Sequence, residues 1–371
     1  MQTTRAEVPK YQQVFTTLRR QIESGRWKPG ERLPSEAELV RTFDASRITV
    51  GRAVRDLQSA GLVQRRAGSG TYVAPVTPAK NGMSFGLLIP DLGETEIFEP
   101  ICQGMMSSPL AREHALLWGS VDGGGASIAE RAWQLCRQYI DRRVSGVFFA
   151  PVELTPEKDD VNQRIVRALE EARIPIVLLD RPALPYPGRG DHDLVGIDNR
   201  DAGFVITEHL LRLGCGRLAF VALPNAAATV DAREAGYREA LYSREHPIDR
   251  ASIRRIDPAA SAAVYALMDT YRPDGIVCAN DRTAGRMMHT LLQLKYAIPR
   301  DVRLVGIDDI DYASLLPVPL TTLRQPTRQI GDAALSAMLE RVKRPAVPPR
   351  DIFLHCRLVI RASCGAAHPA F

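Results

Sequence analysis

Short apolar segments that alternate with helical patterns occupy most of the chain after residue 82 and limit the folds it can adopt. They are rich in Val, Ile, Leu and Phe, a composition typical of strands covered on both faces. This alternation predicts an α/β fold of doubly wound parallel sheets. The predicted strands are residues 84–90, 115–120, 144–151, 175–180, 194–198, 217–224, 274–280 and 302–308.

This part of the chain, residues 83–363, is long for one sheet and its helices, so two lobes are expected. Polar side chains gather where predicted strands end: Asp180 and Arg181, then Asn280, then Asp308. Ligands of such sheets bind beyond the carboxyl ends of the strands. Carboxylates, amides and guanidinium groups form directed hydrogen bonds with hydroxyls, which indicates a neutral ligand with many hydroxyl groups.

The N-terminal part carries a different charge from the rest. Residues 1–80 hold 14 Lys and Arg against 7 Asp and Glu, a net charge of +7, whereas the remainder has a net charge of −2. A basic head on a nearly neutral body indicates a polyanionic partner for the head alone.

The head has the pattern of three helices followed by two strands. The first helix is expected from Lys10 to Ser24, and Ser35 with Glu38 forms a capping box for the second. Ser46 is expected to cap the third helix, whose apolar stripe is Val50, Ala53, Val54 and Leu57.

The third helix is followed by two short strands around a glycine-rich turn, residues 67–70. Its apolar stripe leaves Arg47, Thr49 and Arg52 on other faces. This order predicts a winged helix-turn-helix, whose third helix enters the major groove of DNA.

The motifs PGERLPSE, SRITV and GSGTYV, within residues 10–73, resemble the DNA-binding domain of the GntR family of bacterial transcription regulators. Some members carry a base-reading arginine where this chain has Ala37, so its operator preference is expected to differ. The resemblance implies DNA contacts by Ser35, Arg47, Thr49, Arg52, Gly68, Ser69 and Gly70.

The segments IPIVLLDRP, PDGIVCANDRTA, VRLVGIDDIDYASLLPVPLTTLRQP and LVIRAS resemble the effector domain of LacI-type regulators, which is similar to type I periplasmic sugar-binding proteins. The resemblance implies three crossings between the lobes, near residues 196–199, near Gln325 and around Arg350. It also implies ligand contacts by Phe98, Asp180, Arg181, Arg233, Asn280, Asp308 and Gln325.

These patterns predict a winged-helix domain at residues 1–73, a linker at 74–82, an effector and dimerisation domain at 83–363 and a tail at 364–371. Lobe one is expected at about residues 83–196 and 326–350, and lobe two at about 197–324 and 351–363.

The chain is therefore expected to be a ligand-controlled repressor that binds a near-palindromic DNA operator as a homodimer and is released by a small sugar or sugar derivative. A cytoplasmic location is expected because the N-terminus lacks an apolar signal core and no segment is long enough to cross a membrane. The six cysteines are scattered without metal-type spacing, and no cofactor or metal is expected.

Two other classes of protein fit the sequence less well, a sugar-binding transport receptor and a carbohydrate-acting enzyme. The missing signal segment and the basic head disfavour the receptor. No nucleophile elbow or strand-following GxGxxG motif supports an enzyme. The sequence leaves open whether the effector is a neutral sugar, a sugar acid or a sugar phosphate, and whether it releases or strengthens DNA binding.

Overall fold

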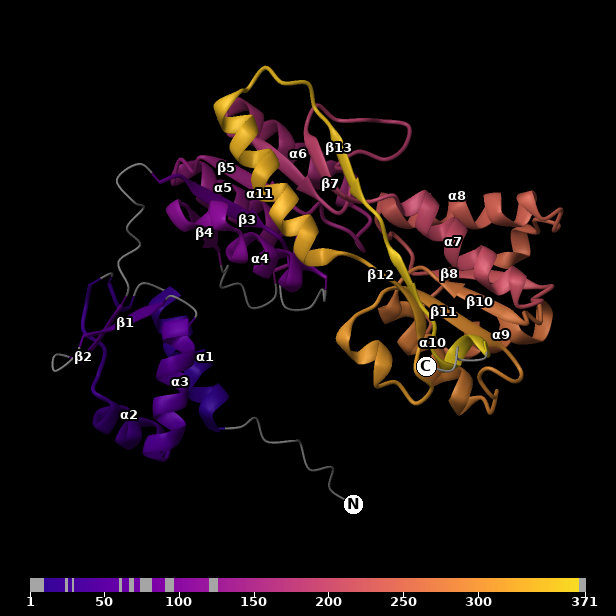
Figure 1. The fold of residues 1–371 in the computed structure, drawn as a ribbon, viewed down its shortest axis with the longest axis horizontal. Helices are drawn as coiled ribbons and strands as arrows, with labels where there is room; N and C mark the ends of the chain where they lie inside the picture. Colours follow the sequence, from indigo (N-terminus) through magenta and orange to yellow (C-terminus); the bar gives the residue numbers. More distant parts are fainter. Residues whose placement is uncertain are drawn as a thin grey trace. The chain divides into compact units, whose positions relative to one another are not determined.

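The computed structural model describes residues 10–23, 26–28, 30–59, 62–66, 70–73, 82–90, 97–119 and 126–366. The chain divides into two compact units, Met1–Asn81 and Gly82–Phe371, which are described separately (Figure 1).

The N-terminal unit is a winged helix-turn-helix, as the sequence predicts. Its apolar stripe is buried, because Val50, Val54 and Leu57 of the third helix pack with Val14 and Leu18 of the first, and each is at most 1% exposed. The two strands are antiparallel. The elements are α1 (Lys10–Glu23), α2 (Glu36–Phe43), α3 (Arg47–Ser59), β1 (Val63–Arg66) and β2 (Gly70–Val73).

The C-terminal unit contains two six-stranded sheets, one in each lobe (Figure 1). The sheet of lobe one is parallel throughout, in the order β13-β7-β6-β5-β3-β4. Its elements are β3 (Ser84–Leu88), α4 (Phe98–Ser107), β4 (Ala115–Trp118), α5 (Ile128–Asp141), β5 (Gly146–Phe149), α6 (Lys158–Glu171), β6 (Ile176–Leu179), β7 (Asp193–Ile197), α11 (Thr327–Lys343) and β13 (Asp351–Leu354).

The sheet of lobe two has the order β14-β12-β11-β10-β8-β9, and only β14 among its strands runs antiparallel to its neighbour. Every predicted strand is present, whereas β9, β12, β13 and β14 were not among the predicted strands. The elements are α7 (Asn199–Arg212), β8 (Leu218–Ala222), α8 (Ala228–Ser243), β9 (Ile253–Arg255), α9 (Ser261–Thr270), β10 (Gly275–Cys278), α10 (Asp281–Gln293), β11 (Arg303–Asp308), the short helix η3 (Asp311–Ser314), β12 (Thr321–Arg324), β14 (Arg357–Val359) and the short helix η4 (Ala362–Cys364).

The chain passes between the lobes three times. The first crossing joins β7 to α7 and the second joins β12 to α11. The third lies at residues 355–356, between β13 and β14, and the expected crossing around Arg350 is wrong. The reason is that β13 pairs in parallel with β7, so residues 351–354 belong to the sheet of lobe one.

The expected tail also begins too early, because Cys364 is fully buried at the end of η4. Its neighbour Ser363 explains this burial. The Ser363 hydroxyl donates to the carbonyl oxygen of Leu304 and accepts a hydrogen bond from the amide of Thr321. These bonds attach η4 to β11 and β12.

Each lobe contains a pair of helices that touch through glycine. A Cβ atom on Gly104 of α4 would lie 2.2 Å from the carbonyl oxygen of Arg328, and one on Gly331 of α11 would lie 2.0 Å from that of Ile101. In lobe two, Gly203 of α7 and Gly236 of α8 make equivalent approaches, at 2.0 and 1.9 Å. A side chain at these positions cannot fit unless the helix backbones move apart.

We therefore expect Gly331→Ala to destabilise the C-terminal unit by about 2–3 kcal/mol, because overpacking forces the backbone to shift. Gly285→Ala in α10 is the matched control, since its added Cβ would lie 3.5 Å from the nearest side chain. It should be neutral or stabilise the helix by up to about 1 kcal/mol. Thermal unfolding of both variants measures the difference, and equal stability would contradict the close packing of α4 and α11.

Candidate functional site

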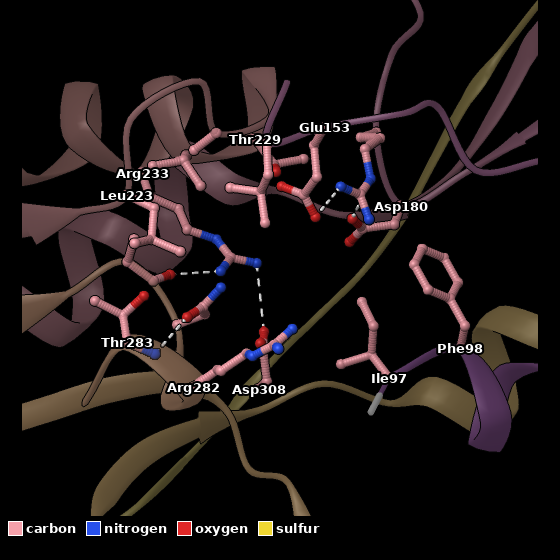
Figure 2. A pocket seen from close by; sticks show the side chains of 16 residues that line it. Ile97, Phe98, Glu153, Asp180, Leu223, Thr229, Arg233, Arg282, Thr283 and Asp308 are labelled. Carbon is pink, nitrogen blue, oxygen red and sulfur yellow. Dashed lines mark hydrogen bonds and ion pairs between the residues drawn. The ribbon is translucent and has the colours of Figure 1, made fainter. Parts of the chain in front are cut away.

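A cavity of about 80 Å³ lies between the lobes, at the carboxyl ends of strands from both sheets (Figure 2). Its position matches the region where ligands bind in doubly wound sheets. Gln325 is the one predicted ligand residue that does not line it; it is buried next to the cavity and donates to Asp308 at 2.8 Å. The structure brings together the other six predicted residues, Phe98, Asp180, Arg181, Arg233, Asn280 and Asp308.

Arg181 holds the side of the cavity that belongs to lobe one. Its guanidinium forms ion pairs with Glu153 and, at 3.3 Å, with Asp180, and it lies 5.3 Å from the ring centre of Phe98. Burial raises the pKa of Asp180, against the opposing attraction of Arg181 and Arg233. Burial acts in the same direction on Glu153, but the pairing with Arg181 prevails and lowers the pKa of that carboxyl.

Arg233, from α8, holds the side that belongs to lobe two. Its Nε donates to Asn199 at 2.8 Å, one terminal nitrogen donates to the carbonyl oxygen of Ala279 at 2.6 Å, and the other lies 3.5 Å from Asp308 (Figure 2). The amide of Asn280 caps α10 by accepting from the amide N–H of Thr283. The guanidinium of Arg233 is therefore held by Asn199 of α7, by Ala279 after β10 and by Asp308 of β11.

Two of the cavity aspartates occupy unusual backbone conformations. Asp180 and Asp308 have φ angles of 66° and 131°, a region that non-glycine residues seldom adopt. Such conformations cost on the order of 1–3 kcal/mol each and cluster at functional sites. Asp180 directly follows β6 and Asp308 ends β11, and both residues line the cavity.

Some buried polar atoms beside the cavity have no partner in the described structure. They are the Oδ1 atom of Asp180 and the Oε1 atom of Gln325, whose residues are 5% and 3% exposed. A buried acceptor without a donor is costly. A ligand hydroxyl in the cavity would satisfy the Oδ1 atom of Asp180, which lines it.

Two charged residues of the cavity were not predicted from the sequence. Glu153 lies shortly after β5, and Arg282 lies in the first turn of α10, two residues after Asn280. Both positions follow a predicted strand, so the rule applied to Asp180 and Asn280 could have found them.

The rim of the cavity joins the two lobes. The amide of Leu154 donates to the carbonyl oxygen of Asn225 at 2.8 Å, and the amide of Ala227 donates to the Glu153 carboxylate at 3.2 Å. Glu153 and Leu154 follow β5 of lobe one, whereas Asn225 and Ala227 follow β8 of lobe two. Glu153 thus contacts Arg181 inside the cavity and the opposite lobe at its rim.

Asp281 is buried beside the cavity without lining it. It accepts hydrogen bonds from the hydroxyl of Thr322 at 2.6 Å and from the amide of Ile310 at 3.2 Å. Burial, together with the negative charge of Asp308, raises its pKa to about 8, although the two hydrogen bonds oppose the shift.

The predicted DNA-binding residues of α3 lie on the surface of the N-terminal unit. Arg47 and Arg52 are exposed, and Thr49 is half-buried, with its hydroxyl 2.8 Å from that of Ser46. The Arg52 guanidinium lies 4.1 Å from the ring centre of Tyr11.

The remaining predicted DNA contacts lie before α2 and in the wing. Ser35 forms the predicted capping box with Glu38. Gly70 begins β2 with a φ of 121°, next to the side chain of Arg32. Gly68 and Ser69 lie outside the described residues. Of the two arginines at the end of β1, Arg65 forms an ion pair with Glu36.

Comparison with known proteins matches the two units separately. Residues 10–73 match the family of bacterial regulatory proteins called gntR, and residues 207–364 match a periplasmic binding protein-like domain. The chain combines a GntR-type DNA-binding domain with a periplasmic-binding-protein-like domain. The family identity of both predicted units is therefore confirmed.

The relatives described here cover between 76% and 96% of this chain. The arabinose metabolism transcriptional repressor of Geobacillus stearothermophilus is 26% identical over 96% of this chain and 98% of its own. The structure of a transcriptional regulator CelR–cellobiose complex has a TM-score of 0.65 at 22% identity, over 86% of this chain and 91% of the other. A LacI family regulator from Enterococcus faecium with bound ribose has a TM-score of 0.61 at 23% identity, over 76% and 98%.

Among the helices that the structure describes, none has the length and apolar character needed to cross a bilayer. In the same residues, His, Cys, Asp and Glu side chains form no group of three or more that could hold a metal ion.

The raised pKa of Asp281 predicts a pH-dependent stability of the periplasmic-binding-protein-like domain. A carboxyl that binds its proton more tightly in the folded state contributes most stability below its ordinary pKa of 3.8, and this contribution is lost as the pH rises through about 8. Calorimetry of the wild type and of Asp281→Asn between pH 5 and 9 measures it. The melting temperature of the wild type should fall relative to that of the variant as the pH rises, and parallel profiles would contradict the assignment.

Proposed function

We propose that this chain is a transcriptional repressor whose affinity for DNA is controlled by a small, hydroxyl-rich, sugar-like effector. The observation that carries the proposal is the coexistence of two sites in one chain: an arginine-bearing recognition helix and an interlobe cavity lined by carboxylates and guanidiniums. The near full-length similarity to an arabinose metabolism repressor supports the same conclusion. This similarity to a repressor also agrees with the prediction that the chain is not an enzyme.

In this proposal, α3 enters the major groove and the wing follows the neighbouring minor groove. Arg47 and Arg52 offer guanidinium forks that match the two acceptors of a guanine edge or a phosphate. Thr49 contacts a base or phosphate, and Ser35 contacts the DNA backbone. The glycine-rich wing tip, which includes Gly68, Ser69 and Gly70, brings backbone close to the minor groove.

The effector would bind between the lobes and hold them in one relative orientation. Hydroxyls donate to Asp180 and accept from Arg181 and Arg233, so a single ligand contacts both lobes at once. Coupling between two binding sites is reciprocal. An effector that favours the released form therefore lowers the affinity for DNA by a certain factor, and bound DNA lowers the affinity for the effector by the same factor. We propose that the effector lowers the affinity for DNA and so releases the operator, which is induction.

We also propose a homodimer that binds a near-palindromic operator in the cytoplasm. Lobe one carries exposed apolar side chains on consecutive elements: Met106 of α4 at 60%, Leu110 in the following turn at 46%, and Trp118 at the end of β4 at 42%. β4 is also an edge strand of its sheet. A partner of the same kind would cover these groups and place two DNA-binding domains on two half-sites.

Arg47→Ala should weaken binding to an operator selected from random duplexes by about 1–3 kcal/mol and relax the base preference at one position. Arg20→Ala is the matched control, because Arg20 is an exposed arginine of α1 and its loss removes the same charge. Fluorescence anisotropy with the selected site and single-base variants measures both effects. Full discrimination by Arg47→Ala would refute the role of this side chain.

Asp308→Ala should keep operator binding and lose the response to effector, because Asp308 connects Arg233 and Gln325 beside the cavity. Asp332→Ala, which removes an exposed carboxylate of α11, should respond normally. Operator release is followed by anisotropy while effector candidates are added, with circular dichroism as a check of folding. Normal release of a folded Asp308→Ala would show that the effector binds elsewhere.

A further inference from the structure

Among the residues that the structure describes, one guanidinium of the cavity has no counter-charge. The carboxylates of Glu153 and Asp180 flank Arg181, and the carboxylate of Asp308 faces Arg233. Arg282 also lines the cavity, yet it forms no hydrogen bond or ion pair with any residue that the structure describes. The described part of the chain thus provides partners for the other two cavity arginines and none for Arg282.

Arg282 lines two cavities of the C-terminal unit. It belongs to lobe two, but it also lines a second cavity of about 170 Å³ on the side of lobe one, together with Phe98, Glu153 and Arg181. Its side chain is partly buried, so water compensates its charge only in part. In Figure 2 it extends from the base of α10 toward the centre of the site.

The backbone around Arg282 adds positive potential. Arg282 is the second residue of α10, a helix of 13 residues whose N-terminal cap, Asn280, lines the same cavity. Helix N-termini favour anions. Asp281 does not cancel this field in the cavity, because its carboxyl group is directed at Thr322 and Ile310 and does not line the site.

The opposite side of the cavity requires a different chemistry. The buried Oδ1 of Asp180 has no donor, and it is available to a ligand hydroxyl. A ligand that satisfies both sides carries hydroxyls at one end and negative charge at the other. Neutral sugars satisfy the first requirement and leave Arg282 unpaired.

We propose that the effector is an anionic sugar derivative, a sugar acid or a sugar phosphate, and that Arg282 selects it by pairing with its carboxylate or phosphate. This inference rests on the proposed function and deepens it, since it assigns the charge of the effector. Arg282 then acts as the specificity-determining residue, and the residues around Asp180 bind the hydroxyls.

The test uses matched probe sets, each a neutral aldose, its aldonic acid and its phosphate ester: ribose, ribonate and ribose 5-phosphate; arabinose, arabinonate and arabinose 5-phosphate; glucose, gluconate and glucose 6-phosphate. Calorimetric titration gives each affinity, with inorganic phosphate as a control for the ion alone. In at least one set an anionic member should bind about tenfold or more tightly than its aldose. Whether the acid or the phosphate binds best identifies the anionic group.

Arg282→Gln should reduce the affinity for that anion by roughly 10- to 100-fold and close the gap to the aldose, because hydrogen bonds to charged groups contribute this much. Arg286→Gln is the matched control, since Arg286 lies one turn further along α10, is exposed and does not line the cavity. It should keep the preference of the wild type.

The inference is overturned if the aldose binds most tightly in every set, or if Arg282→Gln keeps the preference for the anion. Operator release in the same samples separates the two proposals. A neutral aldose that binds and releases the operator leaves the proposed function intact and removes this inference. A panel in which no probe binds or releases the operator contradicts both.

Discussion

The buried charges between the lobes are the constraint on which the rest of the C-terminal unit depends. Arg181, Arg233 and Asp180 are each at most 5% exposed, and a buried charge is tolerated only when other groups compensate it. Compensation requires that loops from different strands meet at one point. The parallel sheets supply that meeting point, because their strands end along the same edge.

The same arrangement connects binding with movement of the lobes. Glu153 forms an ion pair with Arg181 inside the cavity and accepts a hydrogen bond from the amide of Ala227 in the opposite lobe. Gln325, at the second crossing, donates to Asp308. A ligand that competes for these carboxylates therefore acts on contacts that join the lobes and on the segments through which the chain crosses between them. The close glycine contacts keep α4 with α11 and α7 with α8, so each lobe can move as a unit.

Much of this organisation could be predicted from sequence because it depends on local rules. Ser35 and Glu38 have the spacing of a capping box, and the strands before Asp180, Asn280 and Asp308 are continuous apolar segments. The third crossing could not be placed in this way, since residues 351–354 are a short strand whose lobe is decided by pairing with β7. The strand-end rule could have placed Arg282 in the site, but its lack of a partner among the described residues is visible only in the assembled cavity.

The most direct test of the account is the reciprocity of its two binding sites. Operator affinity is measured with and without a saturating effector, and effector affinity is measured with and without operator, on the same wild-type protein. The account predicts that both affinities change by one common factor, roughly 5- to 150-fold for a coupling of 1–3 kcal/mol. An operator affinity that is unchanged when the cavity is fully occupied would contradict it.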